Sequence, residues 1–282
     1  MQYEKIDLYA VNQLARGKAP KGYLYAYVPH QMWEIKKKVR PAVIVCPGGG
    51  YEFWSEREGE PVALRFLSAG YAAFVLDYDL NTPHPEPLFQ ACMAIKYLRE
   101  NADKYGIEKD LIASVGFSAG GHLAGSFGTL YGEEEITSRL GVSKEQLRPD
   151  AVILSYPVIT TEEGVTHEGT KSVITGGKAE LIKKLSLENA VDAQSSPAFI
   201  WHTRTDTCVP VENSYRMALA YQQAGVPYEL HIFEHGCHGL SVADQEVFDD
   251  GNENILPEVA VWLPLALTWL KGRGFVVKTK NE

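Results

Sequence analysis

The sequence predicts an α/β fold with a mostly parallel central sheet, flanking helices and a small cap insertion. Short apolar runs, typical of strands buried on both faces, alternate along the chain with helical patterns. The sequence Gly116-Phe117-Ser118-Ala119-Gly120 also follows one such run and precedes a helix of small residues. Strand, tight turn and helix in that order are typical of parallel α/β sheets.

Each predicted strand is an apolar or bulky run bounded by turn residues. They are expected at 23–28, 41–46, 71–76, 111–115, 151–156, 197–202 and 228–233. Helical patterns cover 61–69, 88–105, 211–223 and 264–270. Residues 1–22 are expected to be a polar lead-in, and 34–40 a solvated loop. Residues from about 159 to 191, rich in Gly, Thr, Lys and Glu, interrupt the alternation. We expect a single domain over 1–282, with this segment as the cap.

The composition excludes several classes of function. The chain has 282 residues, 45% of them hydrophobic, which suits one large domain. Its net charge of -9 argues against nucleic acid or an anionic membrane as the main partner. The longest apolar run, Val259 to Leu270, contains Pro264 and is well short of the ~20 residues that span a bilayer.

The first residues and the cysteines indicate the cellular compartment of the protein. The chain begins without a basic region followed by an apolar run, so no signal peptide is expected. Cys46, Cys92, Cys208 and Cys237 form no C-x-x-C pair and no metal-ligand spacing. We therefore expect free thiols in a reducing cytoplasm, no metal and no cofactor. A homo-oligomer is compatible with the sequence.

Three predicted strands are followed by residues with catalytic chemistry. Ser118 follows the strand at 111–115, Asp206 follows the strand at 197–202, and His238 follows the strand at 228–233. In a parallel sheet these carboxyl ends lie along one edge, where ligands bind. The order Ser, Asp, His is one of the known arrangements of a nucleophile, its orienting acid and its base.

Asp206 and His238 each have an alternative interpretation. Asp206 could instead cap the helix near Val211, since aspartate is common just before helices. His235 competes with His238 as the base, and the pair His235-x-x-His238 could indicate a metal. His238 is preferred because Gly239 lets the loop present the ring, and no further metal ligands stand out.

A glycine triplet supplies the remaining part of an acyl-transfer site. Gly48-Gly49-Gly50 directly follows the first buried strand, so its backbone amides can face a substrate without intervening side chains. An oxyanion needs such preorganised N–H donors. We expect the amides of Gly49, Gly50 and Ala119 to form an oxyanion hole. Tyr51, Phe53 and Trp54 come next and are candidate substrate contacts, although ordinary packing explains them equally well.

Together these motifs resemble the α/β-hydrolases. The segments 47–51 (Pro-Gly-Gly-Gly-Tyr) and 117–124, Asp206 before Val209-Pro210, and His238-Gly239 are similar to bacterial carboxylesterases of the acetyl-xylan and feruloyl esterase branch, near the hormone-sensitive-lipase group. The resemblance runs from about residue 20 to the last helix. It implies Ser118 as nucleophile, His238 as base, Asp206 as orienting acid, and the Gly49, Gly50 and Ala119 amides as oxyanion hole.

Three positions depart from the family pattern. Pro47 stands where the hormone-sensitive-lipase group has His, which favours the sugar-ester branch. Tyr78-Asp79-Leu80 replaces the usual Tyr-Arg-Leu, and a common aspartate in the long helix is replaced near Gln90. The last two departures affect the contacts expected beneath the loop that begins with Gly48-Gly49-Gly50, which we call the oxyanion loop.

The expected function is that of a serine carboxylesterase on short acyl esters, with acetylated sugars as one candidate class. The sequence shows no long apolar lid helix of the lipase type. Two other classes stay open: a serine peptidase of the same fold, and a non-catalytic interaction protein on the same scaffold. A peptidase of this kind generally has a large additional domain, and a non-catalytic relative is expected to lack one of the three catalytic residues.

Overall fold

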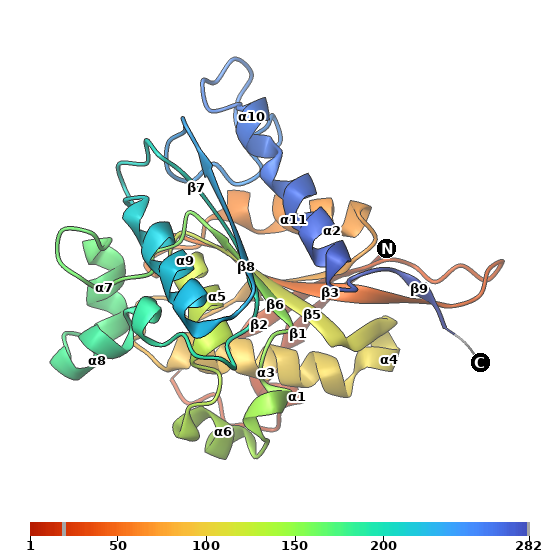
Figure 1. Ribbon diagram of the computed structural model, residues 1–282. Helices are drawn as coiled ribbons and strands as arrows, with labels where there is room; N and C mark the ends of the chain where they lie inside the picture. Colours follow the sequence, from red (N-terminus) through yellow and green to blue (C-terminus); the bar gives the residue numbers. More distant parts are fainter. Residues whose placement is uncertain (19–20, 281–282) are drawn as a thin grey trace.

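The computed structural model describes residues 1–18 and 21–280 and has a twisted sheet covered by helices on both faces (Figure 1). The strands run in the spatial order β1-β2-β4-β3-β5-β6-β7-β8. The strands from β4 to β8 are parallel, while β1 and β2 form an antiparallel edge. The bounds are β1 Gln2–Asp7, β2 Tyr23–Val28, β3 Lys38–Cys46, β4 Ala72–Asp77, β5 Ile107–Phe117, β6 Ala151–Ser155, β7 Ala198–Thr203, β8 Tyr228–Phe233 and β9 Lys278–Thr279.

Alternation along the strands divides the core into two layers. In β3, Ile44 faces the layer that contains α3, whereas Val43 and Val45 face the layer that contains α2 and α11. Both faces are buried, which is why these strands consist of continuous apolar runs. The larger helices are α2 Glu60–Ser68, α3 Glu86–Glu100, α5 Ala119–Thr129, α9 Glu212–Ala224 and α11 Trp262–Gly272.

The remaining helices are short. They are α1 Leu8–Val11, α4 Ala102–Tyr105, α6 Glu134–Leu140, α7 Glu168–Thr175, α8 Ala179–Lys184 and α10 Pro257–Ala260. Helices α7 and α8 contact each other and lie in the connection between β6 and β7, inside the segment predicted to be a cap. The α/β fold with a mostly parallel sheet is confirmed.

Three expectations about local structure were wrong. Gln2–Asp7 is a strand, β1, paired with β2, although the lead-in was predicted to be irregular. Its side chains are mostly exposed and only Ile6 is buried, so its sequence has no clear apolar pattern. The helix predicted over 88–105 breaks at Asn101, whose side-chain amide donates to the carbonyl of Tyr97 at 2.9 Å. Strand β3 begins at Lys38, inside the segment predicted to be a loop.

The described residues contain no helix that is both long enough and apolar enough to span a bilayer. All four cysteines are free thiols. Cys46 and Cys92 are buried, whereas Cys208 and Cys237 are exposed.

Candidate active site

The turn between β5 and α5 places Ser118 at the carboxyl edge of the sheet. Ser118 has φ +54° and ψ -120°, an unfavourable conformation for a residue with a side chain. A Cβ atom on Gly120 would overlap the carbonyl oxygens of Cys46 and Pro47, and one on Gly116 would overlap the carbonyl of Gly120. Glycine at both positions therefore lets the strand and the helix approach closely enough to form the turn.

Ser118, His238 and Asp206 form a continuous chain of hydrogen bonds. The hydroxyl oxygen of Ser118 lies 2.7 Å from Nε2 of His238, and Nδ1 of the same ring lies 2.6 Å from Oδ2 of Asp206. With Nδ1–H donating to the carboxylate, Nε2 is left to accept the serine proton. The three residues come from the loops after β5, β8 and β7, as their positions in the sequence predict.

Asp206 is fixed by donors on both carboxylate oxygens. Oδ1 accepts the backbone N–H groups of Cys208 and Val209, each at 2.9 Å. Oδ2 also lies 3.2 Å from Nε2 of His202, a fully buried residue of β7. Burial raises the pKa of Asp206, but the hydrogen bonds from His202 and His238 outweigh it and hold the pKa far below its usual range. The carboxylate is therefore charged at every physiological pH.

His235 lies apart from this chain. Its side chain is 65% exposed, and it pairs with Glu234 at 3.4 Å. Of the two histidines that the sequence left in competition, only His238 contacts Ser118.

The loop after β3 carries N–H groups without partners. Within residues 1–18 and 21–280, no hydrogen bond is formed by the amides of Gly49, Gly50 and Ala119. Gly49 has φ +118° and Gly50 has φ +66°, backbone conformations that favour glycine. The loop is closed by the carbonyl of Gly49, which accepts the N–H of Glu52 at 2.9 Å and that of Phe53 at 3.0 Å. Free amides next to a serine nucleophile are what an oxyanion requires.

A buried carboxylate joins three of these loops. Oε2 of Glu58 accepts the N–H of Gly48 at 2.8 Å, and Oε1 accepts the hydroxyl proton of Tyr156 at 2.7 Å. The oxygen of Tyr156 in turn accepts the N–H of Ser241 at 2.8 Å. The Tyr156 ring also packs against His238, with ring centroids 5.0 Å apart. Glu58 therefore connects the oxyanion loop, the end of β6 and the loop that carries His238.

Asp79 and Gln90, the two positions beneath the oxyanion loop that depart from the family pattern, are connected by hydrogen bonds. The side-chain oxygen of Gln90 accepts the backbone N–H of Asp79 at 2.7 Å, and the carboxylate of Asp79 accepts the N–H of Lys21 at 2.8 Å. The neighbouring Tyr78 hydroxyl donates to the carbonyl of Pro47 at 2.6 Å. Support for the loop therefore comes from side chain-to-backbone hydrogen bonds at these positions.

Of the three aromatic residues proposed as substrate contacts, only Phe53 lines the cavity beside Ser118. Tyr51 is buried, and its hydroxyl lies 3.2 Å from Nδ1 of His122. Trp54 donates its indole N–H to the carbonyl of Leu76 at 3.3 Å. Tyr51 and Trp54 thus have the packing role that the sequence left open.

The cavity beside Ser118 has a volume of about 270 Å³, and several polar side chains are among the residues that line it. Besides Ser118, His238 and Phe53, it is lined by Gly49, Gly50, Glu52, Ser55, Arg57, Glu58, His167, Cys208 and Gly239. His167 and Glu58 did not stand out in the sequence. His167 belongs to the cap segment, and Glu58 lies in a charged run, 56–60, that resembles a solvated surface.

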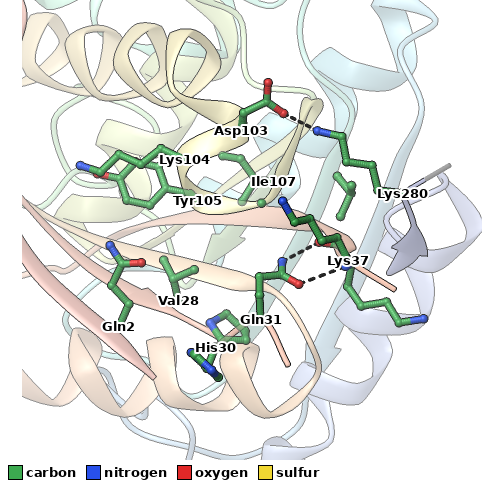
Figure 2. Close-up of a pocket in the computed structure, with 14 residues that line it drawn as sticks. Gln2, Val28, His30, Gln31, Lys37, Asp103, Lys104, Tyr105, Ile107 and Lys280 are labelled. Carbon is green, nitrogen blue, oxygen red and sulfur yellow. Dashed lines mark hydrogen bonds and ion pairs between the residues drawn. The ribbon is translucent and has the colours of Figure 1, made fainter. Parts of the chain in front are cut away.

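A larger cavity, of about 580 Å³, lies at the opposite edge of the sheet (Figure 2). It is lined by the first residues of β3 and β5, so it faces the amino ends of the parallel strands. Two of its cations are paired with carboxylates: Lys280 with Asp103 at 2.6 Å, and Lys104 with Glu4 at 3.0 Å. None of the residues predicted to be catalytic lines this cavity.

A family model named BD-FAE matches residues 27–221 of this sequence, more than half of the chain. The chain belongs to the BD-FAE family. Curated proteins similar to this chain include endo-1,4-beta-xylanase B of Butyrivibrio fibrisolvens, 38% identical over 80% of this chain, and an acetylxylan esterase of Xylanibacter ruminicola, 30% identical over 79%. The alignments span only 35% and 45% of those two proteins.

Solved structures of similar proteins cover nearly the whole chain. An acetyl ester-xyloside bifunctional hydrolase of Caldicellulosiruptor lactoaceticus is 39% identical, with a TM-score of 0.77 over 90% of this chain and 89% of its own. A carboxylesterase of Lactobacillus plantarum is 30% identical, with a TM-score of 0.83 over 98% and 99%. Family and structural neighbours together show that this BD-FAE chain has the α/β-hydrolase fold.

Proposed function

We propose that this protein is a serine carboxylesterase that hydrolyses short-chain acyl esters, acetylated sugars among them, through an acyl-enzyme on Ser118. The observation that carries the proposal is the chain of hydrogen bonds from Ser118 through His238 to Asp206, next to three unpartnered amides. A nucleophile, a base with an orienting acid, and oxyanion donors are the groups that acyl transfer needs.

The mechanism follows from the roles of these atoms. Oγ of Ser118 attacks the ester carbonyl carbon while Nε2 of His238 takes its proton, and the carbonyl oxygen becomes an oxyanion facing the free amides. The bond to the alcohol then breaks, and His238 gives the proton to the departing alcohol oxygen. Water attacks the acyl-enzyme with His238 again as base, which releases the acid and restores Ser118. Asp206 stays charged throughout and stabilises the imidazolium.

The cavity supports a small substrate. Its volume of about 270 Å³ lies at or below the range of roughly 300–1,000 Å³ that is usual for ligand pockets. Polar side chains in its wall, among them Glu52, Arg57 and His167, can form hydrogen bonds with a hydroxyl-rich alcohol. The acetylxylan esterase and the acetyl ester-xyloside hydrolase among the relatives support acetylated sugars as the substrate class.

The expected setting is the cytoplasm, with a small soluble ester as partner and neither nucleic acid nor a membrane. Two exposed thiols, Cys208 and Cys237, support a reducing compartment. The net charge of -9 is unfavourable for polyanions.

The proposal is tested with p-nitrophenyl esters of increasing acyl length and with acetylated xylo-oligosaccharides. We expect kcat/KM to fall from the acetate to the octanoate, and acetate to be released from the oligosaccharides. His238→Gln should lower kcat by roughly 10⁴ or more, whereas His235→Gln should leave it unchanged. Full activity of the His238→Gln protein, or cleavage of peptide but not ester substrates, would refute the proposed function.

A further inference from the structure

The proposed mechanism gives no role to several polar side chains that line the cavity beside Ser118. His167, from the connection between β6 and α7, and Glu52, from the oxyanion loop, lie together over Gly50. A Cβ atom on Gly50 would lie 3.6 Å from Cε1 of His167 and 3.9 Å from Oε2 of Glu52. Gly50 is one of the glycines with an unpartnered amide, so both side chains flank the place where the ester carbonyl would bind.

The hydrogen bonds of His167 fix which ring nitrogen carries a proton. Nδ1 accepts the backbone N–H of Thr170 at 3.1 Å, as the cap of α7, and lies 3.0 Å from the Thr170 hydroxyl. An Nδ1 that accepts leaves the proton of a neutral imidazole on Nε2. Nε2 has no hydrogen-bond partner among the described residues, and the side chain lines the cavity. His167 therefore presents one N–H donor of fixed tautomer to the substrate space.

The charge state agrees with this assignment. Burial and the nearby His238 lower the pKa of His167, and these effects outweigh the opposing influence of Glu52. The ring is thus neutral at neutral pH. Glu52 forms no hydrogen bond through its carboxylate within residues 1–18 and 21–280, so it supplies an acceptor beside the donor.

An acetyl group cannot use this donor-acceptor pair. Its carbonyl oxygen is taken by the oxyanion amides, and its methyl group has no polar atom. A hydroxyl on the alcohol part of the ester, in contrast, can accept from Nε2–H and donate to a carboxylate. We propose that His167 and Glu52 form a hydroxyl-recognition subsite, which selects esters of polyols and sugars over esters of simple alcohols. This inference rests on the proposed esterase function.

The test compares two acetates of the same carbon skeleton, glycerol monoacetate and propyl acetate, which differ in the hydroxyl groups of the alcohol. Acid release is followed in a pH-stat at pH 7.5. The wild-type protein should have the higher kcat/KM on glycerol monoacetate. His167→Ser keeps an acceptor for the Thr170 N–H but removes the imidazole Nε2–H, so it should lower kcat/KM on glycerol monoacetate roughly fivefold to tenfold, mainly through KM. Propyl acetate should be hydrolysed as before.

Three further variants complete the test. Glu52→Gln should reduce the preference for glycerol monoacetate in the same direction, whereas Glu168→Gln, an exposed change one residue from His167, should not. His167→Asn retains both a capping oxygen and an N–H donor and should recover part of the preference. Equal losses on both acetates, or no preference in the wild type, would overturn the subsite. If the wild type cleaves propyl acetate and Ser118→Ala does not, the esterase function stands in either case.

Discussion

The carboxylate of Glu58 is shared between the N–H of Gly48, at 2.8 Å, and the hydroxyl of Tyr156, at 2.7 Å. It is a buried acid, 3% exposed, and its partners lie in two loops that are far apart in the sequence. A Cβ atom on Gly48 would lie 2.6 Å from Oε2 of Glu58, so the close approach of loop and carboxylate requires a glycine at this position. Glu58 thus positions the oxyanion loop relative to the nucleophile.

Replacing Glu58 should therefore reduce catalysis more than substrate binding. In Glu58→Ala the Gly48 amide and the Tyr156 hydroxyl lose their partner, and the loop is free to shift. A misplacement on the order of 1 Å lowers rates by about 10²-fold, so kcat on p-nitrophenyl acetate should fall between tenfold and a hundredfold, with KM nearly unchanged. Glu56→Gln, a change at an exposed position two residues away, is the control. A Glu58→Ala protein that is folded and fully active would contradict this role.

His202 should affect the pH dependence of the reaction. Its Nε2–H is shared between Asp206, at 3.2 Å, and the carbonyl of Val209, at 3.0 Å. His202→Phe removes one donor from the carboxylate, which then holds the imidazolium of His238 more strongly. The acid limb of the kcat/KM profile should therefore move to higher pH. An unchanged profile would show that His202 has only a packing role.

His122 should make stability depend on pH between about 6.5 and 4. Burial lowers its pKa to about 4, from 6.5, against the opposing hydrogen bond to the Leu185 carbonyl. Between these pH values the imidazole of His122 binds a proton in the unfolded chain but not in the folded protein. The contribution of His122 to the free energy of unfolding is therefore fully present above pH 6.5 and is lost as the pH falls toward 4. The loss from this residue should be about 2 kcal/mol at pH 5.

Urea unfolding at pH 7.5 and pH 5.0 measures this effect. His122→Gln should be less stable than the wild type at pH 7.5, because the hydroxyl of Tyr51 and the carbonyl of Leu185 lose good partners. Its further loss on acidification should be smaller by about 2 kcal/mol. If acidification lowered the free energy of unfolding equally in the two proteins, the acid sensitivity would come from residues other than His122.

Two glycine-to-alanine changes should have opposite outcomes. Gly120→Ala puts a Cβ against the carbonyls of Cys46 and Pro47, which are backbone groups that cannot rotate away, so the turn should open and the melting temperature should fall steeply. Gly272 ends α11 and has nothing within 4 Å of an added Cβ, so Gly272→Ala should be neutral or stabilising by up to about 1 kcal/mol. Thermal unfolding of both variants, followed by circular dichroism, measures the difference. A Gly120→Ala protein as stable as Gly272→Ala would contradict the close packing of strand and helix.

The sequence was informative where local pattern and tertiary position coincide. Residues 41–46 and 151–155 are buried on both faces, so their burial appears as an unbroken apolar run. Residues directly after such strands lie at one edge of the sheet, which is why Ser118, Asp206 and His238 could be expected to meet.

Other parts of the site depend on contacts that leave no local signal. Glu58 is an acid among Glu56, Arg57 and Glu60, and only its fit between Gly48 and Tyr156 distinguishes it from a surface residue. His167 lies over Gly50 because the connection between β6 and α7 folds back across the oxyanion loop. Of the aromatic residues after Gly50, Phe53 lines the cavity, whereas Tyr51 turns inward to His122, and the sequence alone does not separate the two cases.

The central claim is that Ser118 is the acylated nucleophile. Its most direct test is to treat the folded protein with a fluorophosphonate and to locate the adduct by peptide mass spectrometry, with Ser118→Ala and the remote Ser68→Ala treated in parallel. The account predicts one adduct on Ser118, loss of esterase activity in step with labelling, no adduct in Ser118→Ala, and normal labelling of Ser68→Ala. Esterase activity that persists in a folded Ser118→Ala protein, or an adduct on another residue that accompanies inactivation, would contradict it.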